Sequence, residues 1–84
     1  MNKLIEYSEN FETINNQMPL RSNCNSMTVV NTGTATAAIN AIPILPNQQY
    51  VIQGNENEIN TTTYLLSFTT AGTQQVIVIR KTYK

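Results

Sequence analysis

The densest group of oxygen-bearing side chains lies at residues 55–60, in the order Asn-Glu-Asn-Glu-Ile-Asn. Calcium binds carboxylate and amide oxygens in such loops, and a pair of carboxylates can hydrolyse a glycosidic bond. The order differs from the Asp-x-Asp-x-Asp-Gly arrangement of known calcium loops, and only Glu56 and Glu58 supply carboxylates. Two carboxylates so close on one loop rarely lie on opposite sides of a sugar. We expect a solvated hairpin loop, with calcium binding as the alternative.

Nucleophilic catalysis lacks most of the residues that it requires. The chain has no His, no Asp and one Cys, so a Ser-His or Cys-His relay has no base and zinc has no ligand set. Cys24 forms no internal disulfide, and Arg21 is the only cation near it in the sequence, so we expect an inert, buried or half-buried thiol. The three glycines are isolated and form no phosphate-binding loop. We therefore expect no enzyme, no cofactor, no metal and no small-molecule substrate.

Charge is balanced over the whole chain and separated along it. Five Lys and Arg residues offset five Glu residues, and the pI is about 6.1. A neutral chain lacks the basic surface that nucleic acid attracts, so we expect no nucleic-acid partner. Acidic residues lie near the start of the chain and basic residues near its end: Glu6, Glu9 and Glu12, and Arg80, Lys81 and Lys84. We expect the basic end of one copy to meet the acidic segment of a neighbouring copy.

Uncharged polar residues take the place of charged ones. Charged residues are 12% of the chain, about half of the usual share, whereas Asn, Thr, Gln and Ser together number 34 of 84. A neighbouring subunit can cover such side chains at a lower desolvation cost than Lys or Glu. The composition therefore favours surfaces that contact other subunits.

From residue 26 onward the sequence is typical of β-structure, with short strands separated by Gly, Pro and Asn turns. Tyr64, Leu66 and Phe68 lie on one face of such a strand. The alternation changes phase at Ala41-Ile42, where we expect a bulge or bend, and Pro46-Asn47 predicts a turn. The expected strands cover residues 26–32, 34–41, 49–53, 61–70 and 74–83. This pattern predicts an all-β fold, a small antiparallel β-sandwich or barrel of about five to six strands over residues 26–84.

Residues 1–25 follow a different pattern, and we interpret them as an N-terminal arm. Its apolar residues recur at steps of three and four, which is helical spacing: Leu4, Tyr7, Phe11, Ile14 and Met18. Several Asn residues and the lack of a clear cap weigh against a helix, so the arm is either extended or a short helix. Pro19 separates it from the sandwich. In both cases the apolar residues need a partner surface.

Oligomerisation is the expected means of stabilisation. A chain of 84 residues without a disulfide or a metal buries only a modest share of its surface. The run Val76–Ile79 is apolar at every position, so both faces of its strand need cover, either from a neighbouring subunit or from the arm. We therefore expect a homo-oligomer. The interface candidates are Leu4, Ile5, Phe11, Ile14, Met18, Val76 and Val78.

Four stretches carry a resemblance to a known class: VVNTG at 29–33, INAIPILPNQQY at 39–50, GNENEINTTTY at 54–64 and VIRKTY at 78–83. They resemble small β-sandwich virion proteins of bacteriophages, particularly phages of Bacteroidetes-type hosts. In those proteins an INGIPIxPG strand–turn pattern precedes a GNxxEID loop and a C-terminal VIRK strand. Ala41 and Asn47 stand where that pattern has Gly. The likeness covers residues 27–84 and leaves the arm uncovered.

The resemblance implies a structural virion component: a capsid decoration, vertex, spike-base or tail protein that contacts other virion proteins. It implies no catalytic residue and a location in the virion, after synthesis in the host cytoplasm. No stretch approaches the ~18 apolar residues of a membrane span, and the N-terminus does not resemble a signal peptide. The alternatives are a binding module, either an adhesin or a carbohydrate-binding sandwich, and a small inhibitor of a host enzyme.

Overall fold

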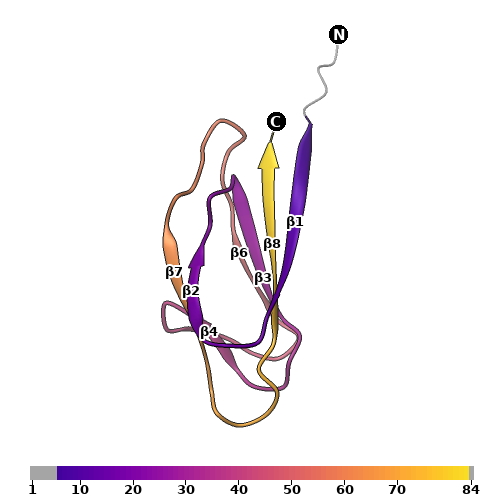
Figure 1. The fold of residues 1–84 in the computed structure, drawn as a ribbon, viewed down its shortest axis with the longest axis vertical. Helices are drawn as coiled ribbons and strands as arrows, with labels where there is room; N and C mark the ends of the chain where they lie inside the picture. The colour runs from indigo at the N-terminus through magenta and orange to yellow at the C-terminus, as the bar shows by residue number, and fades with distance from the viewer. Residues whose placement is uncertain (1–5, 84) are drawn as a thin grey trace.

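The structure, a computed structural model, describes residues 6–83 and consists of two antiparallel sheets of four strands each (Figure 1). The strands are β1 Tyr7–Ile14, β2 Met18–Arg21, β3 Ser26–Asn31, β4 Ala37–Ile39, β5 Ile42–Ile44, β6 Gln49–Ile52, β7 Thr63–Phe68 and β8 Val76–Tyr83. The predicted all-β, antiparallel fold is confirmed, although residues 6–83 form eight strands where five to six were expected. None of these residues belongs to a helix that could cross a membrane.

The order of the strands follows a simple rule. One sheet has the order β1-β8-β3-β6 and the other the order β2-β7-β4-β5. The first strand thus pairs with the last, the second with the seventh, the third with the sixth and the fourth with the fifth. A long two-stranded ribbon that is rolled up into two facing sheets has this arrangement, which is the jelly-roll topology.

The closed end of the ribbon is the turn between β4 and β5. Ile39 and Ile42 pair directly, so only Asn40 and Ala41 lie between them. Their φ angles are 48° and 69°, as the two central residues of a type I′ hairpin turn require. The change of phase that the sequence shows at Ala41-Ile42 therefore comes from a hairpin turn rather than the expected bulge or bend, and the strand expected over residues 34–41 is limited to Ala37–Ile39.

The two prolines that follow occupy the expected kinds of position. Pro43 lies in β5, which is an edge strand. One side of an edge strand pairs with no other strand, so the N–H that proline lacks is not needed there. Pro46 and Asn47 form the predicted turn: the Gln48 N–H donates to the Leu45 carbonyl at 3.0 Å, and Asn47 has a φ of 68°.

The segment that the sequence assigns to an arm is part of both sheets. β1 pairs with β8 over its whole length, and β2 pairs with β7. The extended alternative therefore holds for the described part of this segment and the helical one does not. The boundary expected near residue 25 does not divide the fold, because Ile14 and Leu20 are core residues. Leu4 and Ile5 lie outside the described residues.

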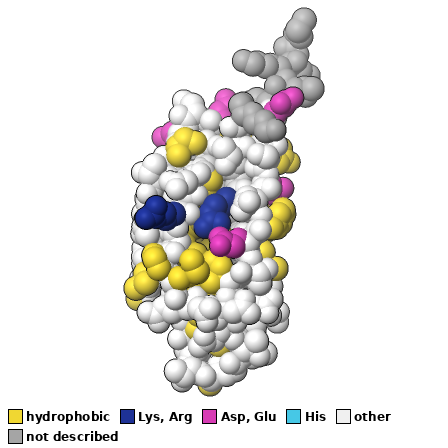
Figure 2. All heavy atoms as spheres, viewed as in Figure 1, with side chains coloured by type: hydrophobic (Ala, Val, Ile, Leu, Met, Phe, Trp, Pro, Cys, Tyr) yellow, Lys and Arg dark blue, Asp and Glu magenta, His cyan; other side chains and the backbone are white. Residues whose placement is uncertain are grey.

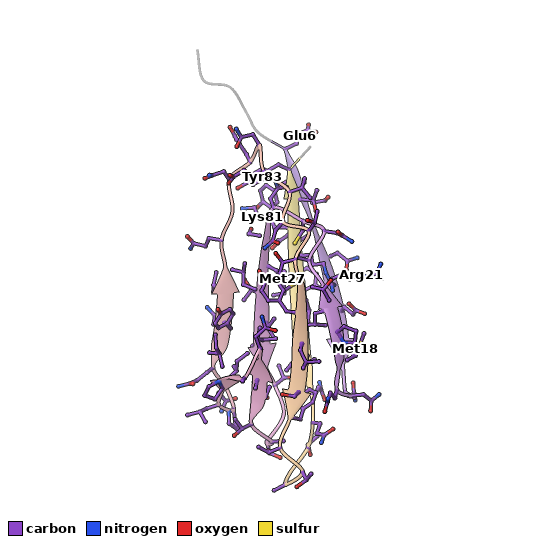
Figure 3. All side chains as sticks on the ribbon, turned by 90° about the vertical axis from the view of Figure 1, so that its left-hand side faces the viewer. Glu6, Met18, Arg21, Met27, Lys81 and Tyr83 are labelled. Atoms are coloured by element: carbon purple, nitrogen blue, oxygen red, sulfur yellow. The ribbon has the colours of Figure 1, made fainter. Side chains whose placement is uncertain are left out.

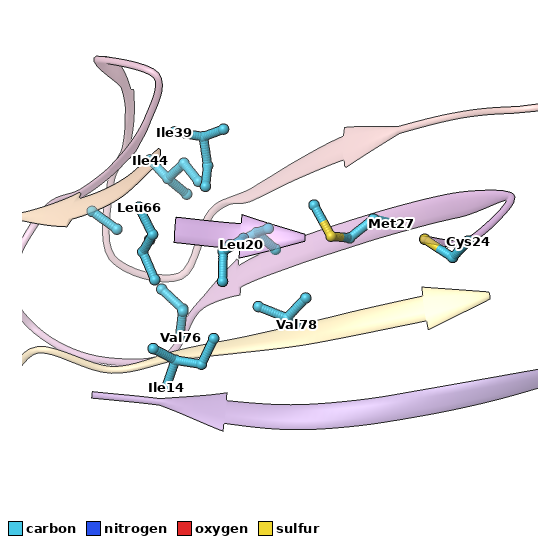
Figure 4. Close-up of a cluster of buried hydrophobic side chains, with 11 residues drawn as sticks. Ile14, Leu20, Cys24, Met27, Ile39, Ile44, Leu66, Val76 and Val78 are labelled. Carbon is cyan, nitrogen blue, oxygen red and sulfur yellow. The ribbon is translucent and has the colours of Figure 1, made fainter. Parts of the chain in front are cut away.

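The core lies between the two sheets (Figure 4). Strand alternation sends every second side chain inward, so each sheet contributes one row of apolar residues. The buried cluster consists of Ile14, Met27, Val29, Val76 and Val78 on the side of one sheet, and Leu20, Ala37, Ile39, Ile44 and Leu66 on the side of the other, with Cys24 beyond β2, where it bridges to Asn60. Tyr50, Ile52, Tyr64 and Phe68 pack against it, so the face predicted for Tyr64, Leu66 and Phe68 is confirmed.

Candidate functional site

The two faces of β8 have different surroundings. Val76 and Val78 point between the sheets and have 0% exposure. Ile77 and Ile79 point to the opposite, outer side and remain partly exposed. The sequence singles out Val76 and Val78 as contacts for a neighbour, and the structure corrects this because the core of one chain already buries them. Within residues 6–83, no segment covers the side that carries Ile77 and Ile79.

The pairing registers define which residues share this side. Residues directly opposite each other in antiparallel strands project to the same side, as do alternate residues along one strand. We call this set the outer face. It consists of Tyr7, Glu9, Phe11 and Thr13 of β1, Ser26, Thr28 and Val30 of β3, Gln49 and Val51 of β6, and Ile77, Ile79, Lys81 and Tyr83 of β8.

An apolar band crosses the middle of the outer face. Phe11 and Val51 lie on its two edge strands and are 65% and 45% exposed. Ile79 lies directly beside Phe11 in the register, Ile77 lies beside Val30 on the adjacent strand, and Thr28 lies between Ile79 and Val51. Large apolar side chains are common singly on a surface, but a contiguous group on one sheet face indicates a contact surface.

An aromatic pair and a cation occupy one end of the outer face. The rings of Tyr7 and Tyr83 meet edge to face with centroids 6.0 Å apart. The Lys81 ammonium lies 4.2 Å from the centroid of Tyr7 and 5.1 Å from that of Tyr83, which is within cation–π range. Glu9 lies directly opposite Lys81 in the register. Figure 3 shows Lys81 and Tyr83 at the same end of the molecule as Glu6.

Acidic and basic residues from the two ends of the chain meet within one molecule. Glu12 of β1 accepts a hydrogen bond from Arg80 of β8 at 2.8 Å, and the Arg80 Nε donates to the Arg21 carbonyl of β2 at 2.9 Å. Arg80 therefore links the two sheets. From the sequence we expected the basic end of one copy to pair with the acidic segment of another. The structure corrects this for Arg80, which pairs with Glu12 of the same chain. Figure 2 shows that charged side chains are few on the viewed side.

The other predicted contact residues are dispersed. Phe11 lies on the outer face, whereas Ile14 is buried in the core. Met18 is 37% exposed and lies on β2, the edge strand of the other sheet. The structure thus brings only one described residue of the predicted set to the outer face. Ile77 and Ile79 complete the surface, and their signal in the sequence is the unbroken run of β-branched residues.

The loop at residues 54–60 is anchored by the buried side chain of Asn25. The Asn25 Nδ2 lies within hydrogen-bond distance of the carbonyls of Asn55, Glu56 and Glu58. Asn55 Nδ2 donates to the Glu58 carboxylate at 2.7 Å, which closes the turn on itself. In residues 6–83, no three His, Cys, Asp or Glu side chains come together in a way that could hold a metal ion. The loop crosses from β6 of one sheet to β7 of the other, so the expected hairpin is corrected.

Cys24 lies in the core, and its thiol is enclosed. It has 0% exposure, and its Sγ lies 3.1 Å from the Ser26 carbonyl as a hydrogen-bond donor. Burial raises the pKa of the Cys24 thiol, while the nearby Arg80 charge acts in the opposite direction. The prediction of a buried thiol is confirmed. A thiol with a raised pKa is a poor nucleophile, so Cys24 contributes packing.

Comparison with known proteins identifies no relative, so the function is inferred from the outer face and the fold. No family model, no curated protein sequence and no solved structure matches the chain. The geometry of the outer face and the topology of the sheets therefore carry the argument on function.

Proposed function

We propose that this chain is a self-associating structural component of a phage virion, such as a capsid decoration, vertex, spike-base or tail protein. The observation that carries the proposal is the outer face: a broad, nearly uncharged sheet surface with an apolar band on a very small domain. A small domain that leaves such a surface in water is stabilised when another subunit covers it.

Two further points support the virion setting. Jelly rolls with eight strands occur in viral capsid proteins, although the same topology also serves lectins and cupins. The strand–turn patterns at residues 39–50 and 54–64 resemble those of small phage virion proteins. The proposed location is the virion, after synthesis in the host cytoplasm, with other virion proteins as further partners and no catalytic activity.

A carbohydrate-binding module is the second candidate, and one observation favours it. Tyr7 is 51% exposed and lies beside Tyr83 and Lys81, so an aromatic ring with an adjacent donor is available to a sugar. This candidate predicts saturable chemical-shift changes at Tyr7 and Tyr83 when a panel of oligosaccharides is added. The structural proposal predicts that the sugars cause none.

Two measurements test the structural proposal. Sedimentation of the purified chain from micromolar to millimolar concentration should show a folded oligomer. Mass spectrometry of purified particles of the phage that encodes the chain should detect it at a fixed stoichiometry. A folded monomer throughout this range would overturn self-association, and the absence of the chain from the particle would overturn the virion setting.

A further inference from the structure

We propose that the outer face packs against the same face of a second copy of this chain, with the two copies related by a two-fold axis. The inference rests on the proposed self-association and adds the surface and the partner. A two-fold interface uses one patch on both copies, so the patch must be compatible with itself in charge and large enough to hold two subunits together.

The edges of both sheets disfavour association by strand pairing. β2 and β5 contain Pro19 and Pro43, which have no N–H to donate, and β6 is only 4 residues long. β1 is 8 residues long but carries Glu9 and Glu12, so antiparallel pairing of two copies would bring carboxylates close together. A sheet face is therefore favoured over an edge.

The outer face is compatible with itself in charge. Among its residues, Glu9 is the only acid and Lys81 the only base, and they lie directly opposite each other on adjacent strands. The remaining polar residues are Thr, Ser, Gln and Tyr, which tolerate cover by another subunit better than charged residues do. Two such faces approach each other without net repulsion.

The area agrees with a dimer of moderate affinity. With a rise of about 3.4 Å per residue and about 4.8 Å between strands, the four strands cover a flat area of roughly 400 Å². Protruding side chains make the accessible area larger, so two faces together approach about 1,000 Å², the lower end for a specific interface.

The outer side of the other sheet is a weaker candidate. Its strands β2, β7, β4 and β5 have 4, 6, 3 and 3 residues, so the surface is smaller. Leu65 is 51% exposed there, but Arg21 projects to the same side and no acidic residue of these strands accompanies it. Two copies of that side would meet with a net positive charge on each.

Charge reversal on the outer face provides the decisive experiment. Glu9→Lys gives the face two positive charges, and Lys81→Glu gives it two negative charges. Each variant alone should dimerise at least tenfold more weakly than the unaltered chain, whereas an equimolar mixture should form heterodimers in large excess over homodimers. Native mass spectrometry measures the three species, and the excess should shrink in high salt because the charges lie at a wet interface.

A pair of apolar variants supplies the control for folding. Phe11→Lys changes the most exposed large apolar residue of the outer face, and Leu65→Lys changes a similarly exposed residue of the other sheet. Both should keep the circular dichroism spectrum of the unaltered chain. Sedimentation should show that Phe11→Lys raises the dimer dissociation constant at least tenfold and that Leu65→Lys leaves it within twofold.

The outcomes separate this inference from the proposal on which it rests. If the unaltered chain is a monomer, self-association fails and the inference fails with it. If the chain is an oligomer that Leu65→Lys dissociates and Phe11→Lys does not, the outer face is the wrong surface while self-association stands. Statistical mixing of the two charge variants together with an unchanged dissociation constant for Phe11→Lys would likewise overturn the outer face as the interface.

Discussion

At the scale of single residues, Asn25 shows how one buried amide positions a loop. Its Nδ2 faces the carbonyls of Asn55 and Glu58, and its Oδ1 accepts the Tyr83 N–H at 2.7 Å. We expect Asn25→Ala to lower the free energy of unfolding by about 2–3 kcal/mol, because the buried Asn25 amide bonds to several backbone groups that would lose their partner. Urea denaturation measures this loss.

Asn57→Ala is the matched control, because Asn57 lies in the same loop and is exposed. We expect it to change the free energy of unfolding by less than about 0.5 kcal/mol. Equal effects of the two substitutions would show that the Asn25 side chain does not hold the loop.

The sequence offers little sign of this role. Asn25 lies in a run of small polar residues, Ser22 to Ser26, which is typical of a solvated loop. In the structure Ser22, Asn25 and Asn31 are all buried, and most of their partners are backbone groups 13 to 58 residues away along the chain. Such partners depend on the order of the strands, which a local pattern does not contain. By contrast, a lone Cys24 with only Arg21 as a cation near it in the sequence was enough to predict a buried or half-buried thiol.

At the scale of elements, β8 has one face in the core and one on the outer face. We expect Val78→Asp to unfold the chain, because an unpaired carboxylate in the core costs about 3–5 kcal/mol, a large share of the stability of a small domain. Ile79→Asp places the same carboxylate on the adjacent residue, which points outward. We expect this variant to stay folded and to associate more weakly.

Circular dichroism and sedimentation on the two variants check this assignment. A folded Val78→Asp variant would contradict the burial of Val78. An unfolded Ile79→Asp variant would show that the cover of the outer face is essential to the fold of each subunit.

The alternation of apolar residues was sufficient to predict most strands after residue 26, but not those before it. Tyr7 and Phe11 are four residues apart and Ile14 three further on, a spacing that fits a helix. It also fits a strand in which Tyr7 and Phe11 face outward and Ile14 faces the core, as the structure shows. Likewise, all four residues of Val76–Ile79 are β-branched, so the sequence cannot tell which pair lies in the core.

At the scale of the whole molecule, the fold depends on pairings between the ends of the chain. β1 pairs with β8 and β2 with β7, and the only two-residue hairpin joins β4 to β5 within the described residues. The sequence could therefore predict a sandwich or barrel but not the order of its strands. The outer face is a consequence of that order, because it places β1, β8, β3 and β6 side by side.

The stability of such a small chain should depend on its concentration. The single Cys cannot form a disulfide within the chain, and a second copy that binds only the folded subunit raises its free energy of unfolding. For a dimer that unfolds to two separate chains, each tenfold rise in concentration should raise Tm by about 4 °C, given the typical entropy of unfolding per residue. Differential scanning calorimetry over two decades of concentration measures this slope.

The Phe11→Lys variant is the control: it should have a lower Tm than the unaltered chain and a slope near zero, because it unfolds as a monomer. A Tm of the unaltered chain that does not change with concentration would show that the subunit reaches its stability alone.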